Sequence, residues 1–149
     1  KVVLHRQSTV HSMVTFADGS TKALLSRPDM RSAISYALTY PKRASLVEPL
    51  SPYMGTLTFE EPDLVRFPSL LLGYRAGEMG GTAPCALSCA DEILVPEFLS
   101  GRIGFLDIHK ILEAVLDRCE PCPVTGVEAL EEARDWAVNE TRSFLLRRR

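Results

Sequence analysis

The segment His5-Arg6-Gln7-Ser8-Thr9-Val10-His11-Ser12-Met13-Val14 sets two histidines, a glutamine and a serine between two apolar runs. Val2-Val3-Leu4 precedes the polar residues and Met13-Val14 follows them, and both runs are typical of β-strands. We therefore expect strands over residues 2–5 and 12–16, with a polar loop between them at the edge of a sheet. Side chains on such a loop are free to meet a ligand.

A tight turn and a short helix follow this loop. Asp18-Gly19 is a hairpin signal, so the next apolar run, Thr21–Leu25, is expected to return as the partner strand. A helix over residues 31–40 should begin after Pro28-Asp29 and end at Pro41, because a proline disfavours the helical conformation of the residue before it.

Prolines then punctuate the chain, at positions 41, 49, 52, 62 and 68. This density predicts an extended connector over residues 41–67, and a connector of this length marks a domain boundary.

After Pro68 the apolar residues recur at helical spacing, which predicts four helices with short links and hence a bundle. Pro96 should kink or shorten the second helix, Asp107 should cap the third, and Thr125-Gly126-Val127-Glu128 has the spelling of a capping box for the fourth. Trp136 should be buried. The expected fold class is therefore α+β.

Composition and charge narrow the function classes. The 149 residues are 46% hydrophobic with a net charge of −2. Such a chain can bury a core, but it lacks the concentrated basic face that nucleic acid requires. No apolar run approaches the roughly 20 residues of a membrane span. We expect neither nucleic acid nor membrane as a partner.

The four cysteines allow two interpretations. Cys85 and Cys89 share a helical face, while Cys119 and Cys122 have the spacing of a metal knuckle, so together they could form a tetrahedral zinc site. Alternatively, the first two are small packed helix residues and the other two an incidental loop pair. We favour the second interpretation, because zinc ribbons usually place both pairs on turns.

Several motifs resemble one family, the 1-deoxy-D-xylulose 5-phosphate reductoisomerases. The first segment is similar to the family's His-Pro-Gln-Ser-x-x-His-Ser-Met, and Pro28-Asp29-Met30-Arg31 to its Pro-Asp-Met-Arg. Gly80-Gly81-Thr82 and Phe105-Leu106-Asp107-Ile108 resemble later motifs at the right spacing. Arg6 stands where the family has proline, which frees the turn and adds a charge near the expected site.

The family's glycine-rich dinucleotide loop and metal-binding carboxylates have no counterpart here, so the chain resembles the C-terminal portion. The resemblance implies that residues 1–40 end a catalytic α/β domain with a partial sheet and hairpin, 41–67 connect, and 68–149 form a four-helix bundle.

In the family, NADPH and a divalent metal (Mg or Mn) support isomerisation and reduction to 2-C-methyl-D-erythritol 4-phosphate in the non-mevalonate isoprenoid pathway. That pathway operates in bacterial cytoplasm or plastids. The implied partners are the sugar-phosphate substrate, the N-terminal half of the same enzyme and a second copy in a homodimer. Alone, the chain is expected to be inactive. The alternative is a non-catalytic helical interaction module derived from this family.

The same resemblance points to four site residues. It implies a catalytic role for His11, as a proton relay or support of the substrate loop, and substrate binding by Ser8 and Met30. It places Pro28 and Met30 beside the nicotinamide. The alternatives are that His11 bonds a buried backbone carbonyl and that Pro28 and Met30 are ordinary packing.

Overall fold

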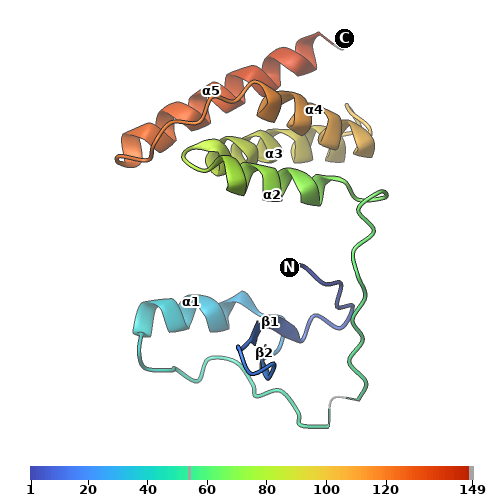
Figure 1. The fold of residues 1–149 in the computed structure, drawn as a ribbon, viewed down its shortest axis with the longest axis vertical. Helices are drawn as coiled ribbons and strands as arrows, with labels where there is room; N and C mark the ends of the chain where they lie inside the picture. Colours follow the sequence, from blue (N-terminus) through green and yellow to red (C-terminus); the bar gives the residue numbers. More distant parts are fainter. Residues whose placement is uncertain (54, 148–149) are drawn as a thin grey trace. The chain divides into compact units, whose positions relative to one another are not determined.

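The computed structural model describes residues 1–53 and 55–147, which form two compact units, Lys1–Pro62 and Asp63–Arg149 (Figure 1). The first unit contains an antiparallel hairpin of β1 (Val10–Thr15) and β2 (Thr21–Leu25), followed by α1 (Met30–Thr39). Over its described residues 63–147, the second contains four helices. The α+β class with a helical C-terminal part is confirmed.

Local chemistry explains the hairpin turn. The Asp18 carboxylate accepts hydrogen bonds from the Ser20 amide at 2.9 Å and the Ser20 hydroxyl at 2.6 Å. Gly19 has φ +83°, a conformation that glycine adopts without steric cost. The two Ser20 bonds lower the pKa of Asp18, because they stabilise its charged form. The Asp-Gly signal thus correctly located the turn.

The strand expected over residues 2–5 does not form. Only Leu4 pairs, in an isolated antiparallel bridge with Glu60, through N–H to O bonds of 2.8 and 3.0 Å. The prediction failed because the partner of this segment lies more than fifty positions away, in the connector. Apart from this bridge, the described residues of the 41–67 connector form no helix or strand.

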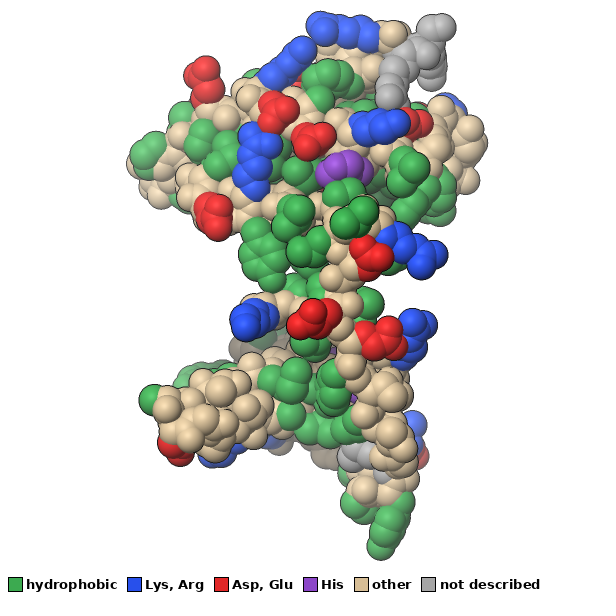
Figure 2. Space-filling model, turned by 45° about the vertical axis from the view of Figure 1, so that its right-hand side comes forward, with side chains coloured by type: hydrophobic (Ala, Val, Ile, Leu, Met, Phe, Trp, Pro, Cys, Tyr) green, Lys and Arg blue, Asp and Glu red, His purple; other side chains and the backbone are tan. Residues whose placement is uncertain are grey.

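Hydrophobic side chains remain on the surface of this chain (Figure 2). In the hairpin, Met13, Val14, Phe16 and Leu24 are 43 to 57% exposed. A two-stranded sheet cannot bury both its faces by itself, so this hairpin offers apolar surface for packing against another polypeptide.

The second unit is built around α3 (Ala83–Leu99), which contacts α2 (Ser69–Met79), α4 (Phe105–Asp117) and α5 (Val127–Leu146). The apolar residues of these helices meet at helical spacing and form one core. Its buried members are Leu72, Ala76, Ala83, Ala90, Leu94, Ile111, Leu112, Val115 and Leu116.

The helix α3 runs through Pro96 to Leu99. Three local expectations in this unit were wrong. Asp107 is the third residue of α4, where its carboxylate accepts from the amide of the N-cap residue Gly104 at 3.0 Å. Thr125 does not cap α5, because the N-cap is Gly126. Trp136 is 36% exposed, since it faces a surface hollow and not the core.

Candidate functional site

A cavity of about 770 Å³ lies in the first unit, between the histidine loop, the end of β2, the start of α1 and the segment after it. All four residues expected in a functional site, Ser8, His11, Pro28 and Met30, line it. The other lining residues are Leu24, Leu25, Ser26, Asp29, Ser32, Ala33, Ser35, Tyr36, Arg43, Ala44, Leu46 and Val47.

The loop that carries Ser8 and His11 is fastened to the connector by His5 and Gln7. The His5 Nδ1 lies 2.8 Å from the Thr58 carbonyl oxygen, so Nδ1 donates and Nε2 accepts from the Thr9 hydroxyl at 3.0 Å. The His5 ring also stacks on Phe59, with centroids 4.7 Å apart. Gln7 donates to the Thr58 hydroxyl at 2.9 Å and accepts from the Thr58 amide at 3.3 Å. His5 and Gln7 therefore hold the loop and leave the cavity to their neighbours.

Backbone irregularities orient Ser8 and His11. Ser8 has φ +51°, a left-handed conformation that is uncommon outside glycine and concentrated at functional sites. Val10 pairs with Leu25 and Ser12 with Leu24, so His11 is the extra residue of a β-bulge. Bulges re-aim side chains next to active sites.

The imidazole of His11 is exposed, and no hydrogen-bond partner for it occurs among the described residues 1–53 and 55–147. The structure therefore does not show the alternative in which His11 bonds a buried carbonyl. An exposed imidazole at a cavity, with no partner among these residues, offers its ring nitrogens for hydrogen bonds to a ligand.

Asp29 shapes the rim beside Pro28 and Met30. Its carboxylate caps α1 by accepting from the Arg31 amide at 2.9 Å, and it also binds the Arg31 guanidinium at 2.5 Å. Hydrogen bonding to Arg31 lowers the pKa of Asp29. This carboxylate therefore stays ionised, and the positive charge of Arg31 balances its negative charge. Met30 is 71% exposed, which places its thioether at the cavity surface and not in a core.

Arg6 does not line the cavity. Its guanidinium forms an ion pair with Glu60 at 3.1 Å, where both side chains are at least half exposed. The hydrogen bond and the charge of Arg6 lower the pKa of Glu60. The added charge is therefore paired with the connector.

No metal-binding set is formed by this chain within the residues that the structure describes. No three His, Cys, Asp or Glu side chains among them converge at ligand spacing. The Cys85 and Cys89 sulfurs lie 4.0 Å apart in α3, but a tetrahedral zinc site needs four ligands. A divalent metal does not fit the residues present here.

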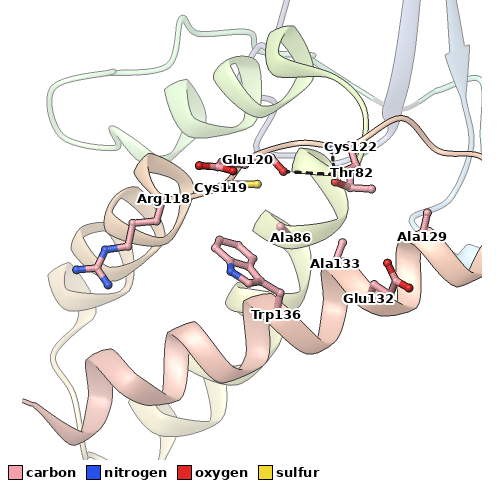
Figure 3. Close-up of a pocket in the computed structure, with 10 residues that line it drawn as sticks. All are labelled: Thr82, Ala86, Arg118, Cys119, Glu120, Cys122, Ala129, Glu132, Ala133 and Trp136. Carbon is pink, nitrogen blue, oxygen red and sulfur yellow. Dashed lines mark hydrogen bonds between the residues drawn. The ribbon is translucent and has the colours of Figure 1, made fainter.

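A second hollow, of about 440 Å³, lies in the helical unit between α3, α5 and the segment 118–122 (Figure 3). Trp136 projects from α5 toward that segment, and Cys119 and Cys122 line the hollow. The Arg118 guanidinium forms an ion pair with Glu140 and lies over the Phe144 ring, so its positive charge is already balanced within the protein.

Tyr36 and Arg43 are lining residues that the sequence patterns did not single out. A signal for Tyr36 was present, because residues 29, 32, 33 and 36 follow the i, i+3, i+4, i+7 spacing of one helical face. Arg43 lies on irregular backbone, for which no periodic signal exists.

Comparisons with known proteins identify a family. A family model described as the DXP reductoisomerase C-terminal domain matches residues 25–140. The chain is 44% identical, over 146 residues, to the 1-deoxy-D-xylulose 5-phosphate reductoisomerase of Citrifermentans bemidjiense, covering 97% of this chain and 38% of that protein. The chain thus spans less than half the length of the relatives it matches.

Solved structures are similar as well. The reductoisomerase from Zymomonas mobilis in complex with NADPH has a TM-score of 0.84 and 37% identity, over 96% of this chain and 38% of that one. A reductoisomerase in complex with NADPH, fosmidomycin and magnesium has a TM-score of 0.76 and 37% identity, over 94% of this chain and 38% of that one.

In the part of the chain that the structure describes, no helix is long and apolar enough to cross a membrane.

Proposed function

This chain belongs to the DXP reductoisomerase family as its C-terminal domain, and we propose that it supplies one wall of a reductoisomerase active site. The reaction is isomerisation and NADPH-dependent reduction of 1-deoxy-D-xylulose 5-phosphate to 2-C-methyl-D-erythritol 4-phosphate. One observation carries the proposal: Ser8, His11, Pro28 and Met30 line a single cavity.

Each of these side chains has a role that suits its chemistry. The His11 imidazole, exposed on its bulge, relays a proton to or from the reacting oxygens. The Ser8 hydroxyl hydrogen-bonds a hydroxyl of the sugar phosphate. NADPH, when bound, supplies the hydride for the reduction. Pro28 and the exposed, adaptable thioether of Met30 cover the flat nicotinamide and keep water from the substrate.

Other parts of the active site come from outside this chain. A divalent metal, Mg²⁺ or Mn²⁺, takes its ligands from the N-terminal half of the enzyme. The apolar hairpin surface supports contact with that half and with a second copy in a homodimer. Bacterial cytoplasm or plastids are the proposed compartments.

A hybrid enzyme tests this function. The matching C-terminal segment of the Zymomonas mobilis reductoisomerase is replaced by this chain, and NADPH oxidation is measured with and without 1-deoxy-D-xylulose 5-phosphate. We expect substrate-dependent oxidation by the hybrid and none by the 149-residue chain alone. A hybrid that folds and binds NADPH but does not turn over would overturn the proposal. The non-catalytic interaction module would then be the better account.

A further inference from the structure

The cavity of the first unit is lined by a positively charged side chain, Arg43, to which none of the roles discussed so far has been given. We propose that Arg43 is the anion-binding residue of this cavity and contacts a phosphate group of the ligand. The inference rests on the proposed function for the class of ligand, since both the sugar phosphate and NADPH carry phosphate.

The first argument is charge pairing. Seven arginines of this chain form ion pairs with carboxylates, but Arg43 forms none with the described residues. Arg27 and Arg31, which are neighbours of cavity residues in the sequence, pair with Glu48 at 3.0 Å and with Asp29 at 2.5 Å. Among the residues that the structure describes, Arg43 is therefore a positive charge without a carboxylate partner, and it lines the cavity.

The second argument is how the Arg43 side chain is held. Its guanidinium carbon lies 4.2 Å from the centroid of the Tyr36 ring, over the ring. Tyr36 projects from α1 and meets Tyr40 edge-on, with centroids 5.7 Å apart. Stacking occupies the face of a guanidinium but leaves its five N–H donors free at the edge. The stack thus positions Arg43 without consuming its hydrogen-bonding capacity.

The third argument is the surroundings. Asp29 also lines the cavity, but its charge is neutralised by Arg31 at 2.5 Å. Ser8, Ser26 and Ser32 also line the cavity, and the Ser26 hydroxyl donates to the Arg27 carbonyl at 3.1 Å. A guanidinium with neighbouring hydroxyls favours a phosphate monoester or diphosphate, because the planar fork binds two phosphate oxygens at once.

Direct binding tests the inference without any catalysis. Inorganic phosphate is titrated into the 149-residue chain, and amide chemical shifts are followed by NMR. We expect saturable shifts around the cavity, weakened about 10- to 100-fold by Arg43→Gln, as for the loss of a charged hydrogen bond. Arg27→Gln is the matched control and should bind as the unaltered chain does. Equal weakening by both variants, or no effect of Arg43→Gln, would overturn the inference.

The hybrid enzyme distinguishes the two sources of phosphate. If Arg43 contacts the sugar phosphate, Arg43→Gln raises KM for that substrate and leaves KM for NADPH unchanged; if it contacts NADPH, the reverse holds. Arg43→Lys keeps the charge but not the planar fork, so its KM for the affected ligand should lie between those of the unaltered hybrid and the Arg43→Gln variant. An unaffected pair of KM values would overturn the inference while the hybrid's activity still supports the proposed function.

Discussion

Thr82 and Cys122 hydrogen-bond each other twice. The Thr82 amide donates to the Cys122 carbonyl at 3.0 Å, and the Cys122 amide donates to the Thr82 hydroxyl at 3.1 Å. These bonds fasten the segment after α4 to the start of α3, where Thr82 is only 4% exposed. They give a structural reason for the Gly80-Gly81-Thr82 motif.

Replacing Gly81 with alanine should destabilise the helical unit. Gly81 has φ +51°, and a Cβ there would overlap the Cys122 carbonyl oxygen. Strain of this kind costs about 1–3 kcal/mol, measured as the free energy of unfolding in urea. Gly77→Ala, in open space within α2, is the control and should stabilise by up to about 1 kcal/mol. A similar effect of both variants would contradict the close approach.

Thr82→Val removes the hydroxyl that accepts from Cys122 and keeps the side-chain shape. The Cys122 amide then loses its partner in a part-buried hydrogen bond, so stability should fall by about 1 kcal/mol. Thr125→Val, at an exposed threonine before α5, should change little. Thermal unfolding followed by circular dichroism measures both, and an unchanged Tm for Thr82→Val would show that the bond contributes nothing.

His11→Ala should lower kcat/KM of the hybrid enzyme about 100-fold or more, because a positioned proton carrier contributes roughly that factor. His109→Ala, at a histidine of α4 that contacts Ser69 and does not line the cavity, is the matched control. Steady-state NADPH oxidation reports both. Equal activity of the two variants would remove His11 from the catalytic residues.

The cysteines should differ in reactivity. Burial, and then the neighbouring Cys85, raise the pKa of Cys89 from 9.0 to about 11, whereas Cys122 is exposed. Since the thiolate is the nucleophile, iodoacetamide at pH 8 should modify Cys122 first and Cys89 last. Peptide mapping by mass spectrometry follows the order, with the urea-unfolded chain as the control. Cys89 reacting as fast as Cys122 would contradict its environment.

The same pKa has a consequence for stability. A thiol whose pKa is higher in the folded chain than in the unfolded chain contributes stability that is complete below about pH 9. This contribution is lost as the pH rises toward about 11. We expect Cys89→Ala to flatten the fall in Tm across this window, and an unchanged pH profile would argue against the raised pKa.

Elements with local signals were predicted well. The helical spacing of Ile111, Leu112, Val115 and Leu116 defined the buried face of α4, and all four are buried. The roles of Ser8, His11, Pro28 and Met30 remain proposals, although the structure brings them to one cavity. Their proximity could not be derived from spacing, because β2 and its turn separate the histidine loop from α1 along the chain.

The sequence by itself determined the hairpin turn, the helical faces and the family, because each depends on neighbours within a few positions or on ordered motifs. Only the tertiary structure decided that Leu4 bridges Glu60, that Trp136 faces a surface hollow, and that Arg43 lies over Tyr36. These are contacts between distant or irregular segments. Their energies depend on how the chain closes its loops and packs, which no local pattern encodes.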